Sequence, residues 1–446
     1  MARRRTAERS REMAAVRQQD AAAARRQGQA AARRREQIRM QQVRASEAAA
    51  PRQASYGGQS REAYEEAARP KQKKARRFYD YSLLFTVIFL TVFGLIMIYS
   101  ASSYKADLLY DGDGAYFMKR QALIAMGGFF LMIVISKMDY HFFARFAILA
   151  YVLSYVLMIA VSIVGREVNG KKRWLGVGPL SFQPTEFVKI ALIVCLSVAI
   201  THYGKRINQF KTMAFVAGLA MPLAFLVTLN NLSSGIIIVG IVFVMLFVAS
   251  NKKLIFAGCV ALAGLVLAFA GQIGAALTSI GLLHDYQLNR INVWLNPEQY
   301  AQEGGFQVLQ GLYAIGSGGL MGKGLGESIQ KMGFVPEAQN DMIFSIICEE
   351  LGLFGAVSVI LIFLFMIYRF MLIADNAPDL FGAMMVVGVM GHIAIQVILN
   401  IAVVTNTIPN TGITLPFISY GGTSVLFLMM EIGIVLSVSN QIKLDR

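Results

Sequence analysis

The sequence predicts an all-α, polytopic membrane protein with ten transmembrane helices. Hydrophobic residues make up 56% of the 446 residues, and the mean hydropathy is positive, at +0.52. Beyond residue 81, apolar runs of roughly 18 residues or more recur, which is the length that a helix needs to cross a bilayer. Short polar links rich in Lys and Arg separate several of these runs. Together these features exclude a soluble globular domain.

The first 77 residues differ from the rest of the chain. They contain 21 Lys and Arg against 8 Asp and Glu, a net charge of +13 out of +15 for the whole chain. Large apolar residues are nearly absent there, so we expect a basic, largely disordered tail without a core. No apolar segment precedes residue 82, and no secretory signal peptide is expected. Attraction to anionic lipids, or plain solvation, is favoured over binding of nucleic acid.

The predicted membrane domain covers residues 78–446. Apolar runs between charged or polar breaks define its spans. The ten predicted spans are residues 82–102, 120–136, 145–164, 184–202, 212–229, 234–250, 254–280, 341–368, 381–404 and 418–440. The fourth span is predicted to start at Pro184, because proline is favoured in the first turn of a helix.

Charge in the links orients these spans. The segments "SKMDYHFFAR", "HYGKRINQFK" and "SNKKL" carry Lys or Arg, as does the tail, so they and both termini are predicted to be cytoplasmic. Four segments then lie outside: 103–119, 165–183, the large loop 281–340 between helices 7 and 8, and 405–417. The large loop contains two weakly amphipathic stretches, and we expect it to fold back on the membrane surface.

Cations also occur on the outer side, against the usual bias. The segment 165–183 contains Arg166, Lys171, Lys172 and Arg173, and "KRQ" at 119–121 adds two more. These positions indicate either binding of an anionic headgroup or phosphate, or snorkelling to outer headgroups, with similar weight.

Charged groups inside a span cost about 2.5 to 3.5 kcal/mol each, so they usually face a protein interior or a cavity. Glu186 and Lys189 share a helix face, and a structural ion pair and a substrate contact are equally compatible with that spacing. Asp341 lies at the start of the eighth span, where a general base and a helix N-cap remain open alternatives. Glu349 and Glu350 lie deeper and are expected to be buried structural partners.

Other polar features are less specific. His392, Gln396 and Asn400 form a stripe that indicates hydrogen bonding between helices. The segment 406–424, "NTIPNTGITLPFISYGGTS", predicts irregular backbone that is suited to a ligand, and Ser419 is a predicted substrate contact there. The glycine-rich segment 314–328 lacks the GK[ST] ending of a phosphate loop. The three cysteines and four histidines show no metal-ligand spacing.

From about residue 80 to 442 the chain resembles the SEDS family of FtsW, RodA and SpoVE, and its motif sequences are most similar to those of the FtsW and SpoVE branch. The matching pieces are "DYSLL", "GLIMIYSASS", "KRQ", "NGKKRWLGVGPLSFQPTEFVKI", "YQLNRI", "LYAIGSGGLMGKGLG", "PEAQNDMIFSIICEELG" and "IPNTGITLPFISYGGTS". The resemblance implies a ten-helix glycosyltransferase that polymerises lipid II outside the bacterial cytoplasmic membrane. It also implies a class B penicillin-binding protein as transpeptidase partner, with other proteins of the division machinery.

The resemblance assigns roles to several residues. Asp341 matches the family's essential acid, and Trp174 matches another functional position. Arg120, Glu186 and Lys189 match polar positions that line the family's cavity. Two departures are present: "NNLSSGI" (230–236) replaces the common "EPDxGTA", and Met342 replaces a Phe.

The expected mechanism has Asp341 accept a proton from the sugar 4-hydroxyl of an acceptor lipid II, which attacks the donor's anomeric carbon with inversion. Arg120, Lys189 and the region of Arg173 would stabilise the leaving diphosphate, and a divalent cation, Mg²⁺ or Mn²⁺, shared with Asp341 is a further expectation. The alternatives are an elongation or sporulation paralogue, a flippase for the lipid-linked precursor, and a scaffold.

Overall fold

The computed structural model describes residues 78–168, 171–177, 180–279 and 285–443, which belong to one compact unit, Ala75–Arg446. The predicted basic tail, 1–77, lies outside the described residues, as do residues 280–284 of the large outer loop.

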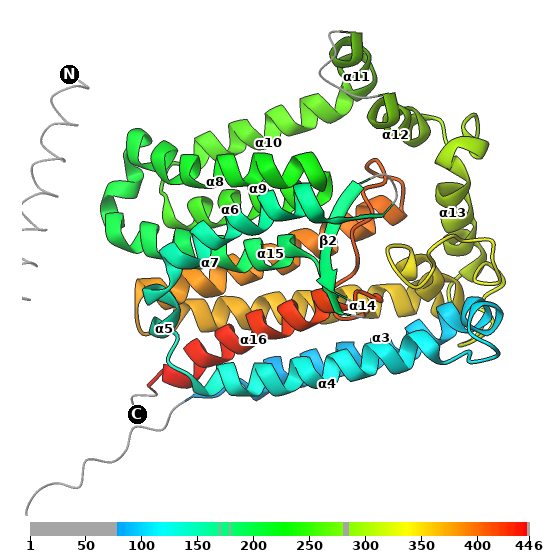
Figure 1. The fold of residues 1–446 in the computed structure, drawn as a ribbon, viewed down its shortest axis with the longest axis horizontal. Coiled ribbons are helices and arrows are strands. Elements are labelled where there is room, and N and C mark those ends of the chain that lie inside the picture. Colours follow the sequence, from blue (N-terminus) through cyan, green and yellow to red (C-terminus); the bar gives the residue numbers. More distant parts are fainter. Residues whose placement is uncertain (1–77, 169–170, 178–179, 280–284, 444–446) are drawn as a thin grey trace, which may run out of the picture. The chain divides into compact units, whose positions relative to one another are not determined.

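Long helices make up nearly all of this unit (Figure 1). They are α3 (Tyr81–Leu109), α4 (Tyr116–Lys137), α5 (His141–Arg145), α6 (Ala147–Val164), α7 (Pro184–Tyr203), α8 (Phe210–Asn230), α9 (Leu232–Ala249), α10 (Lys253–Ala268), α11 (Ala270–Ser279), α12 (Asp285–Leu295), α13 (Phe306–Gly318), α14 (Ile343–Asp375), α15 (Leu380–Val404) and α16 (Thr423–Gln441). Short turns of other helix types cover Gly204–Asn208 and Ala301–Gly305.

The predicted spans are confirmed. In the described part of the chain, nine helices are long and apolar enough to cross a membrane, and the pair α10 and α11, bent by 77°, makes a tenth candidate. Each lies on one of the ten predicted runs. The bend after Ala268 was not predicted, and it directs α11 and α12 towards the end of the bundle where α13 lies (Figure 1).

The connections gather at two opposite ends of the bundle. At one end the Phe78 N–H donates to Ile442 O (3.1 Å), Arg369 binds Asp80 (2.7 Å), and Tyr140 donates to Asp379 (2.9 Å). The other end carries residues 103–115, the described residues between α6 and α7, α12, α13 and the turn before α16 (Figure 1). We call it the outer end, following the orientation predicted from charge. The fold therefore agrees with the predicted alternation, in which successive links between spans lie at opposite ends of the bundle.

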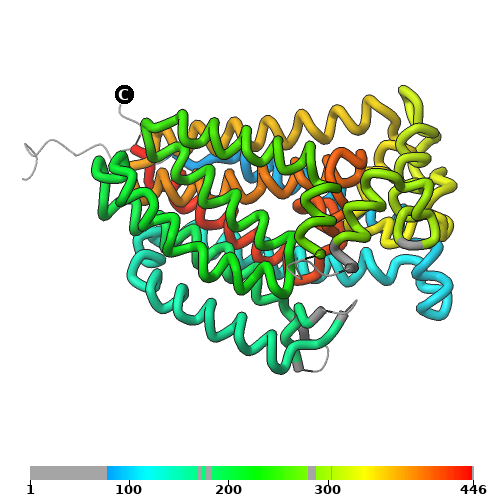
Figure 2. Tube along the Cα trace, turned by 90° about the horizontal axis from the view of Figure 1, so that it is seen from above, coloured from blue at the N-terminus to red at the C-terminus, as the bar shows by residue number. Residues whose placement is uncertain are grey.

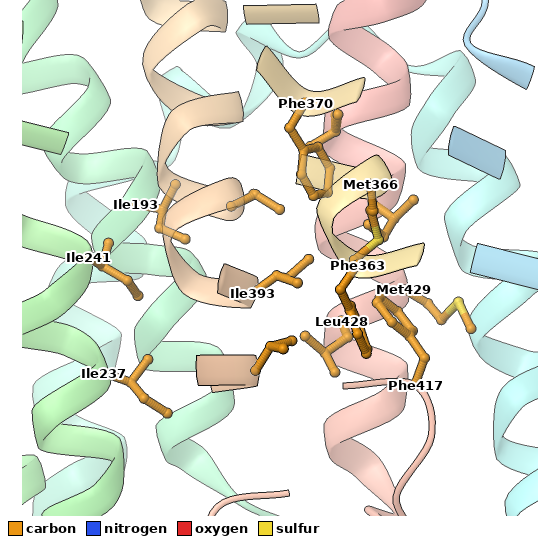
Figure 3. Packing of buried hydrophobic residues seen from close by; sticks show 14 of the residues in the cluster. Ile193, Ile237, Ile241, Phe363, Met366, Phe370, Ile393, Phe417, Leu428 and Met429 are labelled. Carbon is orange, nitrogen blue, oxygen red and sulfur yellow. The ribbon is translucent and has the colours of Figure 1, made fainter. Parts of the chain in front are cut away.

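The hydrophobic core lies where α14, α15 and α16 pack together (Figure 3). Phe363 and Phe370 of α14, Ile393 of α15 and Leu428 of α16 are fully buried or nearly so. The helices α15 and α16 are the most buried spans, whereas α6 keeps few buried residues and lies at one edge (Figure 2). The polar residues of α15 therefore lie in the interior of the bundle.

A small antiparallel sheet, which the sequence did not predict, interrupts the helices at the outer end. Its strands are β1 (Arg166–Val168), β2 (Lys171–Val177) and β3 (Leu180–Phe182), in the order β1-β2-β3. Leu175 pairs with Phe182 across β2 and β3. The sheet joins α6 to α7, so the predicted outer cations of this segment lie on a folded hairpin.

The long helix α14 is broken at Gly352, whose φ of 64° and ψ of −164° are not helical. The glycine-rich segment after α13 fills the break with its own backbone. The four bonds run from Lys323 N to Glu349 O (3.0 Å), from Gly324 N to Glu350 O (2.9 Å), from Leu353 N to Gly319 O (3.0 Å) and from Phe354 N to Leu320 O (3.2 Å). A side chain at Gly322 would overlap the backbone of Glu350, which explains a glycine there. This segment therefore provides hydrogen-bond partners for backbone groups of α14 on both sides of the break.

Candidate active site at the outer end

Asp341 ends the outer loop immediately before α14. That helix begins at Ile343, and its N-cap position is Met342, with no hydrogen bond from a capping side chain. The capping alternative for Asp341 is therefore wrong. Only 8% of Asp341 is exposed, so its carboxylate is buried at the outer mouth of the bundle.

The carboxylate of Asp341 lies among neutral amide groups from three separate segments. Gln307 of α13 approaches Asp341 Oδ1 with its Nε2 at 3.5 Å, and its Oε1 accepts from Asn410 Nδ2 at 3.2 Å. Asn400 of α15 donates to the main-chain oxygen of Asp341 at 2.8 Å and to Ile413 O at 2.7 Å. These contacts fix the backbone of Asp341 more tightly than its side chain.

The environment makes Asp341 a stronger base than an ordinary aspartate. Burial raises its pKa from 3.8 to about 6, and the negative charge of Glu337 acts in the same direction. The hydrogen bond from Gln307 and the positive charge of Arg290 oppose the shift only in part. A carboxyl group with a pKa near 6 is ionised at neutral pH and can still take up a proton, as a general base must.

Two buried glutamates hold the outer loop in place, as expected. Glu349, fully buried, accepts from Lys323 Nζ at 2.7 Å, from Ser328 Oγ, and from the N–H groups of Ile329 and Gln330. Its donors all come from the loop that leads to Asp341. Glu349 therefore acts through that loop and not on a substrate.

Glu350 points to the other side of α14. It accepts from Lys331 Nζ at 2.9 Å and from Ser100 Oγ of α3 at 2.6 Å. Because Ser100 also accepts from Lys331 (3.0 Å), the three side chains form a closed buried group between the loop, α14 and α3. Each of the two acids that looked costly in a membrane helix is thus paired with a lysine of the outer loop.

The structure places the predicted substrate contacts in several environments. Lys189 and Glu186 form a buried ion pair at 2.9 Å, so the charge of Lys189 is balanced within the protein. Ser419 is buried, and its hydroxyl accepts from Leu415 N at 2.8 Å. Arg120 is exposed and approaches Tyr116 OH at 3.5 Å. Their contacts with substrate stay predictions.

The hairpin residues lie beside α8. Arg173 Nε donates to Asn230 O at 3.2 Å, and Trp174, next to it on β2, is half-buried. In the segment that departs from the family pattern, Asn231 accepts from Ser234 N at 3.4 Å and so caps α9. In this chain a neutral side chain therefore caps the start of α9.

Residues missed by the sequence analysis complete the site. They are Gln307 of α13, Asn410 of the turn before α16, and Arg290 of α12, and Arg290 Nη1 donates to Asn410 O at 3.1 Å. The one available signal was that Arg290 lies in "YQLNRI", among the matching pieces. Across the described residues, no group of three or more His, Cys, Asp or Glu is arranged to hold a metal ion.

The fold and the site define a class of protein. It is a polytopic membrane protein that has, at the outer mouth of its helix bundle, a buried carboxylate with a raised pKa. The family model for cell cycle proteins of the FtsW, RodA and SpoVE type matches residues 81–444. The chain therefore belongs to this family.

Individual relatives agree. The stage V sporulation protein E of Bacillus subtilis is 41% identical over 80% of this chain and 95% of its own length. A probable peptidoglycan glycosyltransferase FtsW from Trichlorobacter lovleyi is 36% identical, over 82% of this chain and 94% of its own.

Solved structures share the fold. One chain from work on coordination of polymerization and crosslinking by a peptidoglycan synthase complex has a TM-score of 0.67 and 26% identity, and covers 81% of this chain and 97% of that one. The rod shape determining protein RodA of Thermus thermophilus has a TM-score of 0.58 and 26% identity, with 82% and 98% covered.

Proposed function

We propose that this protein is a peptidoglycan glycosyltransferase that polymerises lipid II at the outer face of the bacterial cytoplasmic membrane, in an FtsW-like role in cell division. Asp341 is its general base. The observation that carries this assignment is a buried carboxylate, with a pKa of about 6, at the outer mouth of a membrane bundle. The names of the relatives support the same reaction class.

The reaction is a single displacement. Asp341 takes the proton of the acceptor's 4-hydroxyl while that oxygen attacks the anomeric carbon of the donor sugar. A new glycosidic C–O bond forms as the bond from the anomeric carbon to the lipid diphosphate breaks, and the diphosphate leaves with the bonding electron pair. Because the described residues place one carboxylate at the site and not a close pair, inversion at the anomeric carbon is expected.

The described residues do not form a complete binding site for a divalent cation. Asp341 is the one carboxylate of its cluster there, and two of the amide oxygens of the cluster, Oε1 of Gln307 and Oδ1 of Asn410, already accept protein hydrogen bonds. The buried Oδ1 of Asn400 has no hydrogen-bond partner among the described residues, and one amide oxygen with one carboxylate does not fill a cation's coordination shell. Mg²⁺ or Mn²⁺ would need oxygens from the substrate's diphosphate. The cation stays a prediction, and no step above depends on it.

The protein is proposed to act with a class B penicillin-binding protein as transpeptidase and with other division proteins at the septum. Its basic tail is proposed to bind anionic lipids at the cytoplasmic face. The similar chain from a synthase complex that coordinates polymerization and crosslinking supports a pairing of this kind.

The test compares the wild-type protein with Asp341→Asn, each supplied with the partner transpeptidase and labelled lipid II. Wild type should produce glycan polymers and the variant should not. Equal polymer from both would refute the role of Asp341. Transfer of lipid II across vesicles without any polymer would instead support the flippase.

A further inference from the structure

Arg290 is the positively charged side chain that the fold connects to the Asp341 site. Its Nη1 donates to Asn410 O at 3.1 Å, and Asn410 Nδ2 donates to Gln307 Oε1 at 3.2 Å. Gln307 in turn approaches Asp341 Oδ1 at 3.5 Å. A continuous set of hydrogen bonds therefore fixes where a guanidinium stands relative to the buried carboxylate.

Most donors of this guanidinium remain available. Arginine carries five N–H donors, and one of those of Arg290 is used by Asn410. Among the described side chains no carboxylate lies within ion-pair distance of Arg290, although Lys323, Lys331 and Lys189 are each paired with a glutamate. The side chain is also exposed at the outer mouth.

Arg290 is not needed to attach α12 to the turn. One helical turn further on, Trp294 Nε1 donates to Asn406 O at 3.0 Å, and Asn406 Nδ2 donates back to Trp294 O at 3.3 Å. Two reciprocal bonds thus hold the helix against the same turn, and Arg290 is left with donors for another purpose. Guanidinium groups bind phosphate oxygens in a bidentate manner, which an ammonium cannot do.

We propose that Arg290, held by Asn410, binds the diphosphate of a lipid-linked substrate beside Asp341. This proposal rests on the proposed function and adds to it a cation that the family resemblance did not single out. The charge of Lys189 is balanced by Glu186, so Lys189 is less suited to bind an anion. Arg290 is therefore proposed to bind the diphosphate in its place. The negative charge on the leaving diphosphate then grows next to a positioned guanidinium.

Binding can be measured without turnover. The full-length chain in nanodiscs is titrated with fluorescent undecaprenyl diphosphate, with inorganic diphosphate and with phosphatidylglycerol as separate competitors. We expect Arg290→Gln to weaken binding of the lipid diphosphate by about 10- to 100-fold, the usual effect of losing a hydrogen bond between charged groups. Arg290→Lys should recover part of this loss, because the charge stays and the bidentate geometry does not.

The matched control is Lys211→Gln. Lys211 is an exposed cation at the start of α8, at the end of that helix which the charge pattern places in the cytoplasm, so its loss should change lipid diphosphate binding little. Unchanged binding by Arg290→Gln, or an equal loss in both variants, would overturn the proposal. Competition by phosphatidylglycerol as strong as by inorganic diphosphate would also overturn it, since the site would then bind any anionic headgroup.

A second readout is independent of affinity. Arg290 and Glu337 are the charged groups that act on Asp341, in opposite directions, and Gln307 faces it without charge. Removal of Arg290 should raise the pKa of Asp341, so the acid limb of the rate profile of Arg290→Gln should move to higher pH, and that of Arg290→Lys should stay. A limb that does not move contradicts the placement of Arg290. Wild type that binds lipid diphosphate but makes no polymer would refute the proposed function alone.

Discussion

Replacing Asp341 by Asn removes the charge of the site and keeps the shape of the side chain. Burial raises the pKa of this carboxyl group from 3.8 to about 6. The difference of about two pKa units corresponds to about 3 kcal/mol between the two protonation states. Because folding raises this pKa, the group stabilises the folded protein fully below pH 3.8, and that contribution is lost as the pH rises through about 6.

At pH 8 the wild-type protein therefore holds an ionised carboxylate that folding disfavours. We expect Asp341→Asn to lose glycan polymerisation and to be more stable at this pH, by up to about 3 kcal/mol. The gain should shrink as the pH is lowered to about 5, where wild-type Asp341 takes up its proton. Unfolding temperatures of the purified proteins in detergent, at one scan rate, measure the difference.

The control is Asp113→Asn, which should show no such gain, because pairing with Lys119 lowers the pKa of Asp113. A structural role for Asp341 predicts the opposite sign. If Asp341→Asn loses activity and also unfolds at a lower temperature than wild type at pH 8, the assignment as a buried general base is wrong.

Three further predictions concern the catalytic pH range, the buried loop contacts and the helix break. The polymerisation rate of wild type at low substrate should fall as the pH drops below about 6, when Asp341, the proposed general base, is protonated. A rate that stays flat down to pH 5 would contradict this role. Lys331→Ala leaves Glu350 buried without its cation and should cost about 3 to 5 kcal/mol, whereas Lys105→Ala, which breaks an exposed pair, should cost less than about 1 kcal/mol; equal unfolding temperatures would refute this ranking. Gly322→Ala meets both a positive φ of 79° and the backbone of α14, so it should lower stability and polymerisation together, and Gly316→Ala, with open space around it inside α13, should be neutral or stabilising by about 0.5 to 1 kcal/mol.

Hydropathy was sufficient to predict the spans, because a helix in lipid must be long and apolar whatever it packs against. The same argument gave no sign of the sheet formed by β1, β2 and β3, because its strands are short and lie outside the apolar spans. It also missed the break in α14, since Gly352 lies inside a single predicted span and its non-helical backbone depends on Gly319 and Leu320 of another segment.

Some residues of the candidate site could likewise be predicted from the sequence, and others could not. Asp341 was a candidate from its position at the start of a span, yet periodicity alone could not separate a base from a cap. The structure excludes the capping role for Asp341, because α14 starts two residues later, at Ile343. Gln307 and Asn410 could not have been predicted from spacing, since about a hundred residues separate them and only tertiary packing brings them together.

The break in α14 also bears on how the protein enters the membrane. Residues 353–375 span about 34 Å as a helix, enough to cross the hydrocarbon layer without the outer half of α14. The preceding turns, with Glu349 and Glu350, need the glycine-rich segment and its lysines before their charges are neutralised. The inner half of α14 is thus long enough to span the membrane by itself, whereas the outer half, which follows Asp341, depends on the loop for its charge balance. Membrane crossing and support of the candidate site are therefore divided between the two halves of one helix.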